Sequence, residues 1–358
     1  MKSAHVDPMF WKGKKVFLTG HTGFKGGWLS LWLASMGAKV TGYALAPKSM
    51  PNLFDVLAID SLIEKSHFAD IRDLATLQKA MTEAKPDVVI HMAAQPLVRY
   101  SFANPVETYA TNVMGTVHAL ESTRSIDTVR ASVVVTTDKC YENKEWVWGY
   151  RENDPMGGFD PYSNSKGCAE LVTSAYRQSY FSGPNSTNRV ASARAGNVIG
   201  GGDWSEDRLL PDAVRAFEAS SSLLVRSPDA TRPWQHVLEP LSGYLILAQK
   251  LFEGGSQYEG AWNFGPADEG NLSVASILNL FASIWGPEAR WEPANKSELH
   301  EAHLLKLDCS RSRDFLGWNP KWKIDQAVKN TASWYMALRN GGNLRELTQL
   351  QIKDYENS

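Results

Sequence analysis

The sequence predicts an α/β fold, with a doubly wound parallel sheet of the Rossmann type and a smaller α/β lobe. Near the N-terminus an apolar stretch runs into a glycine-rich turn and then into an amphipathic helix. Further strand–helix units follow as far as residue 136, which is the pattern of a parallel sheet. Beyond residue 200 the chain is richer in loops, prolines and tryptophans, which indicates a separate lobe. The length of 358 residues is sufficient for both parts.

The first unit predicts a strand at residues 14–19, a turn at 20–27 and a helix that ends at Gly37. Gly20, Gly23 and Gly26 in the turn have the spacing Gly-x-x-Gly-x-x-Gly. Such glycines let the backbone approach the pyrophosphate of a dinucleotide, which the positive end of the helix attracts. A plain strand-to-helix turn without a ligand is the alternative.

The second strand, at residues 39–43, leaves the form of the dinucleotide open. An Asp or Glu at its end commonly holds the ribose 2′-hydroxyl of NAD. Here the chain continues Ala-Leu-Ala-Pro-Lys, with no acid. Lys48 could reach the 2′-phosphate of NADP, but a solvated loop lysine is the simpler interpretation.

The next units supply residues suited to the same crevice. Asp70 lies at a strand end, where it could meet an adenine amino group, and Asp73 is expected to cap the following helix. After the strand at 87–92, the small Ala93 and Ala94 allow a flat cofactor to lie against the backbone. A helix over residues 106–122 carries Asn112 at its middle.

The strand at residues 131–136 leads into Thr137, Asp138 and Lys139, which are therefore expected at the same edge of the sheet. Tyr162 and Lys166 follow with the spacing Tyr-x-x-x-Lys, which places both on one face of a helix. A nearby ammonium lowers the pKa of a phenol, so that the tyrosine can take a proton from an alcohol. An ordinary amphipathic helix often has the same spacing, so the order of the three stretches is what favours redox chemistry at a hydroxyl.

Composition excludes several classes of function. The formal net charge is −2 and 21% of residues are charged, so no basic field indicates nucleic acid. Cys140, Cys168 and Cys309 form no Cys-x-x-Cys pair, which gives no reason to expect a metal site or a disulfide framework. The first ten residues have no apolar signal core, and no apolar run approaches the roughly 20 residues of a membrane span. We therefore expect a cytoplasmic protein with no membrane contact.

In these motifs the sequence resembles the extended short-chain dehydrogenase/reductase family, and within it the nucleotide-sugar 4,6-dehydratases. The matches cover nearly the whole chain: the glycine turn, Asp70 with Ile71, residues 91–94, the strand end at Thr137, and the segments 194–204 and 232–237. The family has Thr-Asp-Glu where this chain has Thr137-Asp138-Lys139. That lysine, the Gly-Gly-Gly-Asp-Trp loop at 200–204 and the segments 301–303 and 307–309 resemble the dehydratases that act on CDP-D-glucose.

The resemblance implies the roles of individual residues. The catalytic set would be Thr137, Asp138, Lys139, Tyr162 and Lys166. Residues that would bind NAD, with NADP not excluded, are Gly20, Thr22, Gly23, Phe24, Lys25, Gly26, Asp70, Ile71, Ala93, Ala94, Gln95, Asn112, Tyr162 and Lys166. Residues that would bind the nucleotide sugar are Arg194, Asn197, Arg208, Leu209, Arg232 and His303. Bidentate guanidinium groups suit diphosphate oxygens, although a single arginine more often forms a surface salt bridge.

The implied reaction oxidises C4 of the sugar, removes water across C5 and C6, and returns the hydride to C6. Tyr162 would be the base at the C4 hydroxyl and Asp138 the acid at C6. Lys139 would be the base at C5, which requires a neutral amine although lysine has an ordinary pKa of about 10.4. The alternative is that Lys139 orients the sugar and another group takes the proton.

The resemblance also implies the domain organisation. Residues 11–199, rejoined by about 232–253, would form the dinucleotide-binding domain. Residues 200–231 and 254–340 would form the nucleotide-sugar-binding lobe, and residues 341–358 a loosely held tail. A homodimer or homotetramer is expected, and the product would serve deoxysugar synthesis for a surface polysaccharide such as lipopolysaccharide O-antigen. A 4-epimerase or reductase of the same fold, or a cofactor sensor without activity, remains as an alternative function.

Overall fold

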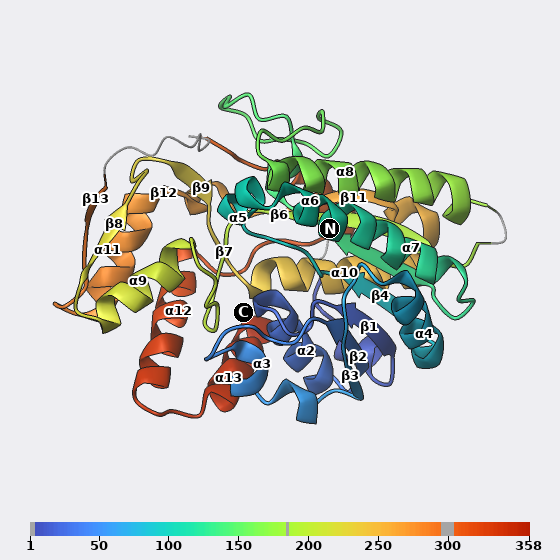
Figure 1. Cartoon of the computed structure of the whole chain (residues 1–358), viewed down its shortest axis with the longest axis horizontal. Coiled ribbons are helices and arrows are strands. Elements are labelled where there is room, and N and C mark those ends of the chain that lie inside the picture. Colours follow the sequence, from blue (N-terminus) through green and yellow to red (C-terminus); the bar gives the residue numbers. More distant parts are fainter. Residues whose placement is uncertain (1–3, 184–185, 295–303) are drawn as a thin grey trace.

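A seven-stranded parallel sheet forms the centre of the computed structural model, which describes residues 4–183, 186–294 and 304–358 (Figure 1). The strand order is β11-β6-β5-β4-β1-β2-β3, so the chain reverses direction across the sheet between β1 and β4. The register places Thr19 beside His91, which aligns the carboxyl ends of β1 and β4. The strands are β1 Lys15–Thr19, β2 Lys39–Ala44, β3 Lys65–Phe68, β4 Val88–His91, β5 Ala131–Val135, β6 Arg189–Ala195 and β11 Gly260–Phe264.

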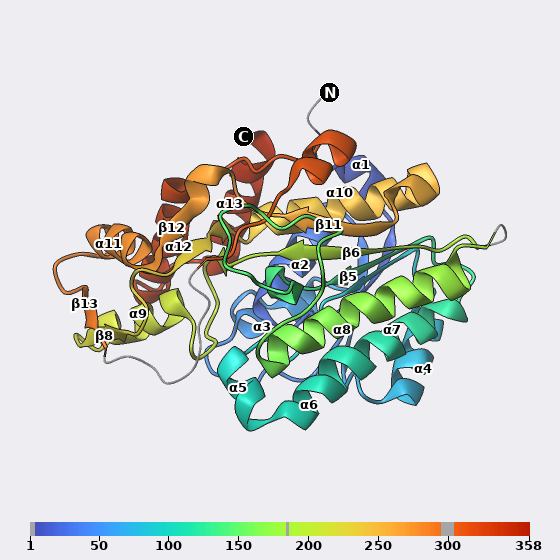
Figure 2. The same cartoon turned by 90° about the horizontal axis from the view of Figure 1, so that it is seen from above.

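Helices cover both faces of this sheet, which confirms the predicted doubly wound fold (Figure 2). One face carries α4 (Leu74–Ala84), α6 (Pro105–Tyr109), α7 (Gly115–Arg124) and α8 (Pro161–Tyr176). The other carries α2 (Phe24–Ser35) and α10 (Leu238–Gly254), whose apolar residues join the large core around Val16 and Leu18. α1 (Pro8–Trp11), α3 (Leu53–Val56) and α5 (Val98–Ala103) are short.

The helix expected over residues 106–122 is present, with a π turn at Ala110–Met114 between α6 and α7. Asp73 caps α4 as predicted, because its side chain accepts a hydrogen bond from the Thr76 backbone N–H. Trp318 is buried in the core. Among the described residues, none of the helices has the length and apolar character that crossing a bilayer would require.

A smaller group of elements lies beside the sheet, at the left of Figure 1. β13 (Arg290–Pro293) pairs in parallel with β8 (Ser222–Val225), and β12 (Asn271–Ser273) pairs antiparallel with β9 (Thr231–Pro233). α9 (Leu209–Glu218) and α11 (Val274–Trp285) pack near them, and α12 (Ile324–Arg339) packs on α11. β7 (Val198–Ile199) and β10 (Gln235–His236) form a two-residue parallel pair that leads from the sheet toward this lobe.

The assignment of residues 254–340 to the second lobe is wrong at β11. This strand pairs in parallel with β6 and forms the edge of the central sheet. Trp262 and Phe264 are buried there, and the Asn263 side chain accepts a hydrogen bond from the Tyr141 hydroxyl. The chain therefore returns to the sheet after α10 before it enters the second lobe again.

The prediction of a loosely held tail is also wrong. Residues Leu344–Asn357 form the helix α13, which packs against α2 and α12. Ile352 and Tyr355 are buried, and the Arg345 guanidinium donates hydrogen bonds to the backbone carbonyls of Leu57 and Ala58. The polar composition of the segment concealed a single buried face of this helix.

Candidate active site

A cavity of about 1450 Å³ opens at the carboxyl ends of β1, β4, β5 and β6 and continues between the sheet and the second lobe. This is where an open parallel sheet places its ligands, on either side of the point where the strand order reverses. Most of the residues singled out from the sequence line this cavity, although they come from segments far apart along the chain.

The glycine turn between β1 and α2 is closely packed on its inner side. A Cβ at Gly26 would lie 2.0 Å from the Gly20 carbonyl oxygen, and a Cβ at Gly20 would lie 2.8 Å from the Ala93 nitrogen. On the outer side, Gly23 is the N-cap of α2 and gives this helix no side-chain cap. The first N–H groups of α2 therefore face the cavity without a capping side chain, which fits the diphosphate of a dinucleotide.

The remaining expected cofactor residues mostly line the same part of the cavity. Thr22, Phe24, Lys25, Ile71, Ala93, Ala94 and Gln95 all do so. Asp70 lines it too, but its carboxylate is bound by the Arg72 guanidinium, which lowers the pKa of Asp70. Lys48 and the other residues that follow β2 also reach the wall.

Asn112 does not take the place that the sequence predicted for it. It is buried, and its side chain bonds to the backbone N–H and carbonyl of Gln95 and to the Ser165 hydroxyl. All its polar atoms are thereby used within the protein, and Asn112 is absent from the lining of the cavity. Asn112 thus links the segment after β4 to α8. It would influence a bound cofactor indirectly, by fixing the position of Gln95.

The end of β5 brings Thr137, Asp138 and Lys139 into the cavity through one turn of 3-10 helix, Asp138–Cys140. The Thr137 hydroxyl donates a hydrogen bond to Asp138 Oδ1 at 3.0 Å. Asp138 is completely buried, and its Oδ2 has no hydrogen-bond partner within the described part of the chain. Lys139 Nζ lies 3.6 Å from Asp138 Oδ1 and 3.3 Å from Asn197 Oδ1. A carboxyl group with one oxygen free of hydrogen bonds from the described residues thus lies beside an amine, so that one group could donate a proton and the other accept one.

Tyr162 and Lys166 reach the same cavity from the first turns of α8. Asp160 caps this helix and the Tyr162 backbone N–H donates to Ser101 Oγ, which together fix the entry of the chain. Burial raises the pKa of Tyr162 to about 12, against a hydrogen bond with Thr137 and the charge of Arg208, which lower it. The ammonium of the neighbouring Lys166 was predicted to lower this pKa, so the net shift in the protein alone has the opposite direction.

Lys166 is held against the end of β5. Its Nζ donates to the Val135 carbonyl at 3.0 Å. Burial lowers the pKa of Lys166 to about 8, and the Glu170 carboxylate opposes this effect. Lys166 is therefore an ammonium whose charge depends on a carboxylate one helical turn away.

The side chain of Lys25 is a feature that sequence reasoning missed, because the residue was considered only as part of the glycine turn. Its ammonium lies 5.9 Å from the centre of the Tyr244 ring. Burial and the charge of Arg208 lower the pKa of Lys25 to about 7. The only signal in the sequence is a charged residue inside the glycine motif.

On the side of the second lobe, Asn197, Arg208, Leu209 and Arg232 line the cavity as expected. Arg208 lies 3.8 Å from Asp203, and Arg232 donates to the carbonyl of Thr231 in β9. His303 lies outside the described residues. At the mouth, Asp207 lies within 3.6 Å of both Arg99 and Arg226, two arginines that belong to none of the motifs in the sequence.

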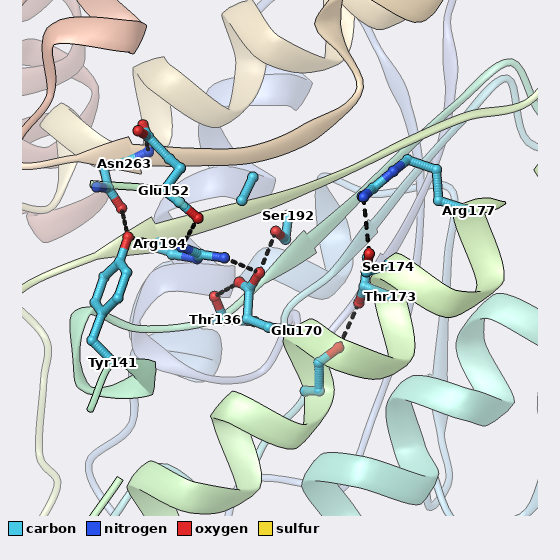
Figure 3. Close-up of polar contacts among 12 residues, drawn as sticks. Thr136, Tyr141, Glu152, Glu170, Thr173, Ser174, Arg177, Ser192, Arg194 and Asn263 are labelled. Carbon is cyan, nitrogen blue, oxygen red and sulfur yellow. Dashed lines mark hydrogen bonds and ion pairs between the residues drawn. The ribbon is translucent and has the colours of Figure 1, made fainter. Parts of the chain in front are cut away.

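Arg194 is not a diphosphate ligand in this structure. It is buried, and its guanidinium pairs with the Glu170 carboxylate at 2.7 Å (Figure 3). It also donates to the Tyr141 hydroxyl at 2.8 Å and to the Glu152 carbonyl at 3.0 Å. Arg194 lies in β6, so its side chain points beneath the end of the sheet and does not line the cavity. In the described part of the chain, no three His, Cys, Asp or Glu side chains gather in a way that could hold a metal ion.

Comparison with known proteins gives three consistent results. The family model described as GDP-mannose 4,6 dehydratase matches residues 17–255. A CDP-glucose 4,6-dehydratase of Salmonella typhimurium is 52% identical over 353 residues, which are 98% of both chains. A dTDP-glucose 4,6-dehydratase of Xanthomonas campestris is 25% identical and covers 89% of this chain and 92% of its own.

Solved structures share the fold. A dTDP-glucose 4,6-dehydratase from Streptomyces venezuelae, solved with NAD, superposes with a TM-score of 0.78, at 21% identity, and covers 91% of this chain and 98% of its own. A UDP-glucose 4-epimerase from Stenotrophomonas maltophila, also solved with NAD, has a TM-score of 0.78 at 19% identity, and covers 92% of this chain and 100% of its own. At this level of identity the likeness shows the fold and leaves the reaction to the site residues.

Proposed function

We propose that this chain, which belongs to the GDP-mannose 4,6-dehydratase family, converts CDP-D-glucose to CDP-4-keto-6-deoxy-D-glucose and is thus an NAD-dependent hydro-lyase. The identity of 52% over almost the full length of a CDP-glucose 4,6-dehydratase supports this substrate. The observation that carries the reaction type is the place of Asp138 and Lys139, in the same cavity as Tyr162. A 4-epimerase or a reductase would need Tyr162 but no second acid and base.

The residues of the cavity fit a dinucleotide, because the uncapped start of α2 can take a diphosphate and Ala93 and Ala94 leave room for a flat ring. We propose NAD in preference to NADP, in line with the related structures that contain NAD. Bound NAD would accept a hydride from C4 of the sugar and give it back to C6. Equilibrium binding of NAD and NADP to the free protein tests the choice, since tighter binding of NADP would reverse it.

The chain's own residues would move the protons. Tyr162, whose pKa the nearby Thr137 hydroxyl lowers, would take the proton of the C4 hydroxyl while Lys166 supplies positive charge nearby. Oxidation at C4 makes the C5 proton acidic, and Lys139 would remove it in its neutral form. Asp138, whose Oδ2 has no hydrogen-bond partner among the described residues, would give a proton to the departing C6 hydroxyl. Water leaves. As the hydride returns to C6, protonated Lys139 would give its proton back to C5, so that the net change is the loss of water and no cofactor is consumed.

The sugar nucleotide would lie toward the second lobe. Arg208 and Arg232 both line the cavity there, so they are the proposed ligands of its diphosphate. Asn197 holds Lys139 and would position it under the sugar ring. Arg194 has no part in this proposal, because its guanidinium is committed to Glu170.

The experiment that tests the function is incubation of the protein and NAD with CDP-, dTDP-, GDP- and UDP-glucose, followed by NMR of the products. We expect a 4-keto-6-deoxy sugar from CDP-glucose at a rate well above the other three. A 4-epimer as the product would support the epimerase alternative. No turnover of any of the four would contradict an enzymatic role and favour a cofactor sensor.

We also propose that the protein is at least a homodimer. Val106 in α6 and Leu171 in α8 expose 82% and 60% of their surface, and the two helices lie on the same face of the molecule (Figure 2). A pair of such helices suits a twofold contact. Light scattering should give at least twice the monomer mass, and Leu171→Glu should lower that mass. A monomer at working concentration would contradict the proposal.

The product would be a precursor of deoxysugars, and we propose that it serves a surface polysaccharide such as lipopolysaccharide O-antigen. We propose that the synthesis takes place in the cytoplasm. A knockout strain that keeps its normal surface polysaccharide would contradict this role.

A further inference from the structure

A buried polar network lies directly beneath the catalytic residues, and its centre is the ion pair between Glu170 and Arg194 (Figure 3). The Glu170 carboxylate also accepts hydrogen bonds from the hydroxyls of Thr136 and Ser192. The two residues are almost fully buried, with 4% of each side chain exposed. Neither lines the cavity, so neither contacts a ligand there.

The partners of this pair are immediate neighbours of the catalytic residues. Thr136 precedes Thr137 in the chain, and Glu170 lies one helical turn after Lys166. On the other side, Arg194 donates to the hydroxyl of Tyr141, which directly follows the turn that contains Lys139. The pair therefore connects β6 with each of the segments that carry the proposed catalytic groups.

Burial of this ion pair costs free energy of folding that apolar side chains of similar volume would not cost. Removing two charges from water is expensive, and well-packed apolar residues of similar volume often give equal or better stability. What the ion pair adds is geometry, because its donors and acceptors fix four segments of the chain relative to one another. Arg194 is also stacked 4.9 Å from the centre of the Tyr141 ring, which fixes that side chain further.

We propose that Glu170 and Arg194 form a positioning pair, which holds the end of β5 against α8 so that the Thr137 hydroxyl meets that of Tyr162. This inference deepens the proposed function and rests on it, because it assumes that Tyr162 and Lys166 act in oxidation at C4.

The pair also influences the charge of Lys166. The titratable groups that act on Lys166 or feel its charge are Lys25 in α2, His91 in β4, Cys140 after β5 and Glu170 in α8. Of these, the Glu170 carboxylate does most to keep the pKa of Lys166 from falling further, and Cys140 has a smaller effect in the same direction. Without its charge the ammonium should lose its proton at a lower pH, and activity that needs this cation should decline there too.

The test uses Glu170→Gln, with Glu239→Gln as the matched control. Glu239 is another buried glutamate, and it holds α10 to the C-terminal segment, where the Tyr355 hydroxyl donates to it. In Glu170→Gln we expect kcat to fall by about 10- to 100-fold with little change in KM, as for a small misplacement of catalytic groups. The basic limb of its pH profile should move to lower pH. Glu239→Gln should leave kcat and that limb as in the wild type.

Three further variants keep the proposal testable if Glu170→Gln does not fold. Thr136→Val removes the hydroxyl bound by Glu170 and leaves all charges in place, so kcat should fall without a shift of the basic limb. Arg194→Lys keeps a cation and should retain more activity than Arg194→Met. Folded variants with the wild-type kcat and the wild-type basic limb would overturn the proposal.

Hydrogen exchange provides a readout that does not need turnover. In Arg194→Met and Thr136→Val, exchange should rise at residues 136–141 and 161–170 together, and it should stay at the wild-type rate there in Glu239→Gln. Unchanged exchange in those two segments would overturn the positioning role. If the wild type forms no 4-keto-6-deoxy product, the proposed function fails on its own, while the exchange result still decides whether the pair aligns the two segments.

Discussion

At the scale of single residues, the property of the site that most needs explanation is the high pKa of Tyr162, because a base must first lose its own proton. Its phenol is buried and has a pKa near 12 in the protein alone, far above neutral pH. The Thr137 hydroxyl and the Arg208 charge both lower that pKa and both lie in the same cavity. Proton removal from the sugar is therefore expected only when the site is assembled around its ligands.

Tyr162→Phe should bind the sugar nucleotide and keep its melting temperature, but should lose oxidation at C4. A general base contributes about 100- to 10,000-fold, so kcat should fall by that factor. The measurement is the single-turnover rate of hydride transfer from CDP-glucose. Tyr109→Phe is a suitable control, because it removes a hydroxyl bonded to Asn164 on the same helix. Turnover close to normal in Tyr162→Phe would contradict the assignment.

Lys139→Ala separates the second step from the first. Lys139 keeps 30% of its side chain exposed at the cavity, where Asn197 and Asp138 orient its amine. The variant should still transfer hydride from C4, but exchange of the C5 hydrogen with solvent deuterium should collapse, as mass spectrometry of the recovered sugar would show. Lys144→Ala, a change of a nearby exposed lysine, should exchange normally. Exchange that survives in Lys139→Ala would mean that another group is the base.

A place in the cavity could be predicted where a motif fixes the residue type together with a strand end or the start of a helix, as for Thr137, Tyr162 and Lys166. Arg194 could not, because a single sequence does not distinguish a guanidinium that faces a cavity from one that crosses beneath the sheet. The signal missed was the carboxylate of Glu170, four residues after Lys166 and therefore on the same helical face. A buried glutamate in that position requires a cation, and Arg194 provides it.

At the scale of elements, the glycine turn between β1 and α2 has two sides with different demands. Gly26 packs against the turn itself, and a Cβ there would overlap the Gly20 carbonyl at 2.0 Å. Gly23 has an ordinary extended backbone (φ −81°, ψ 175°), and a Cβ there would lie 3.4 Å from the same oxygen. A methyl group at Gly23 would therefore take up space only on the outer side of the turn, which faces the cavity.

Gly26→Ala should therefore lower the melting temperature and abolish NAD binding, because the turn must open to accept the methyl group. Gly23→Ala should keep the wild-type melting temperature and weaken NAD binding, because its methyl group would stand where the diphosphate is proposed. Calorimetric titration with NAD and thermal denaturation together measure both effects. Wild-type affinity in Gly23→Ala would place the diphosphate elsewhere.

Helices and strands were predicted well where apolar residues alone form the buried positions, and poorly where polar residues share the buried face. β1, β4 and β5 are short, mostly apolar and buried runs, and their positions match the expectation closely. In α13 the buried positions include Thr348 and Gln351, so the apolar stripe is interrupted. β11 pairs with β6 although the paired residues lie 69 positions apart along the chain, as for Gly260 with Ala191 and Phe264 with Ala195. Local pattern carries no information about such pairing.

At the scale of the whole molecule, Glu239 links α10 of the central domain to the C-terminal segments of the chain. It lies in the first turn of α10 and accepts hydrogen bonds from the backbone N–H groups of Lys321 and Trp322 and from the Tyr355 hydroxyl. The Tyr355 hydroxyl also bonds to Ser242, and the Lys321 ammonium donates to the Tyr355 carbonyl. These bonds fasten α13 to the central domain, in the region that was expected to be loose.

Burial raises the pKa of Glu239 to about 7, against those hydrogen bonds, from an ordinary value of 4.5. The folded protein therefore keeps this proton between pH 4.5 and about 7, where the unfolded chain has lost it. The stability contributed by the group is complete below pH 4.5 and is lost as the pH rises through about 7. The loss amounts to about 3 kcal/mol in the free energy of unfolding.

Glu239→Gln should remove this dependence, because an amide of the same shape does not titrate. We expect the variant and the wild type to unfold at similar denaturant concentrations at pH 5. At pH 8 the variant should unfold at a higher denaturant concentration than the wild type. The difference between the two proteins is the quantity to measure, since buried histidines such as His91 and His236, whose pKa values burial lowers, affect both equally. Glu253→Gln, an exposed change on the same helix, should show no such trend. If the difference between Glu239→Gln and the wild type stays constant from pH 5 to pH 8, Glu239 is ionised in the folded protein throughout, and the three hydrogen bonds outweigh its burial.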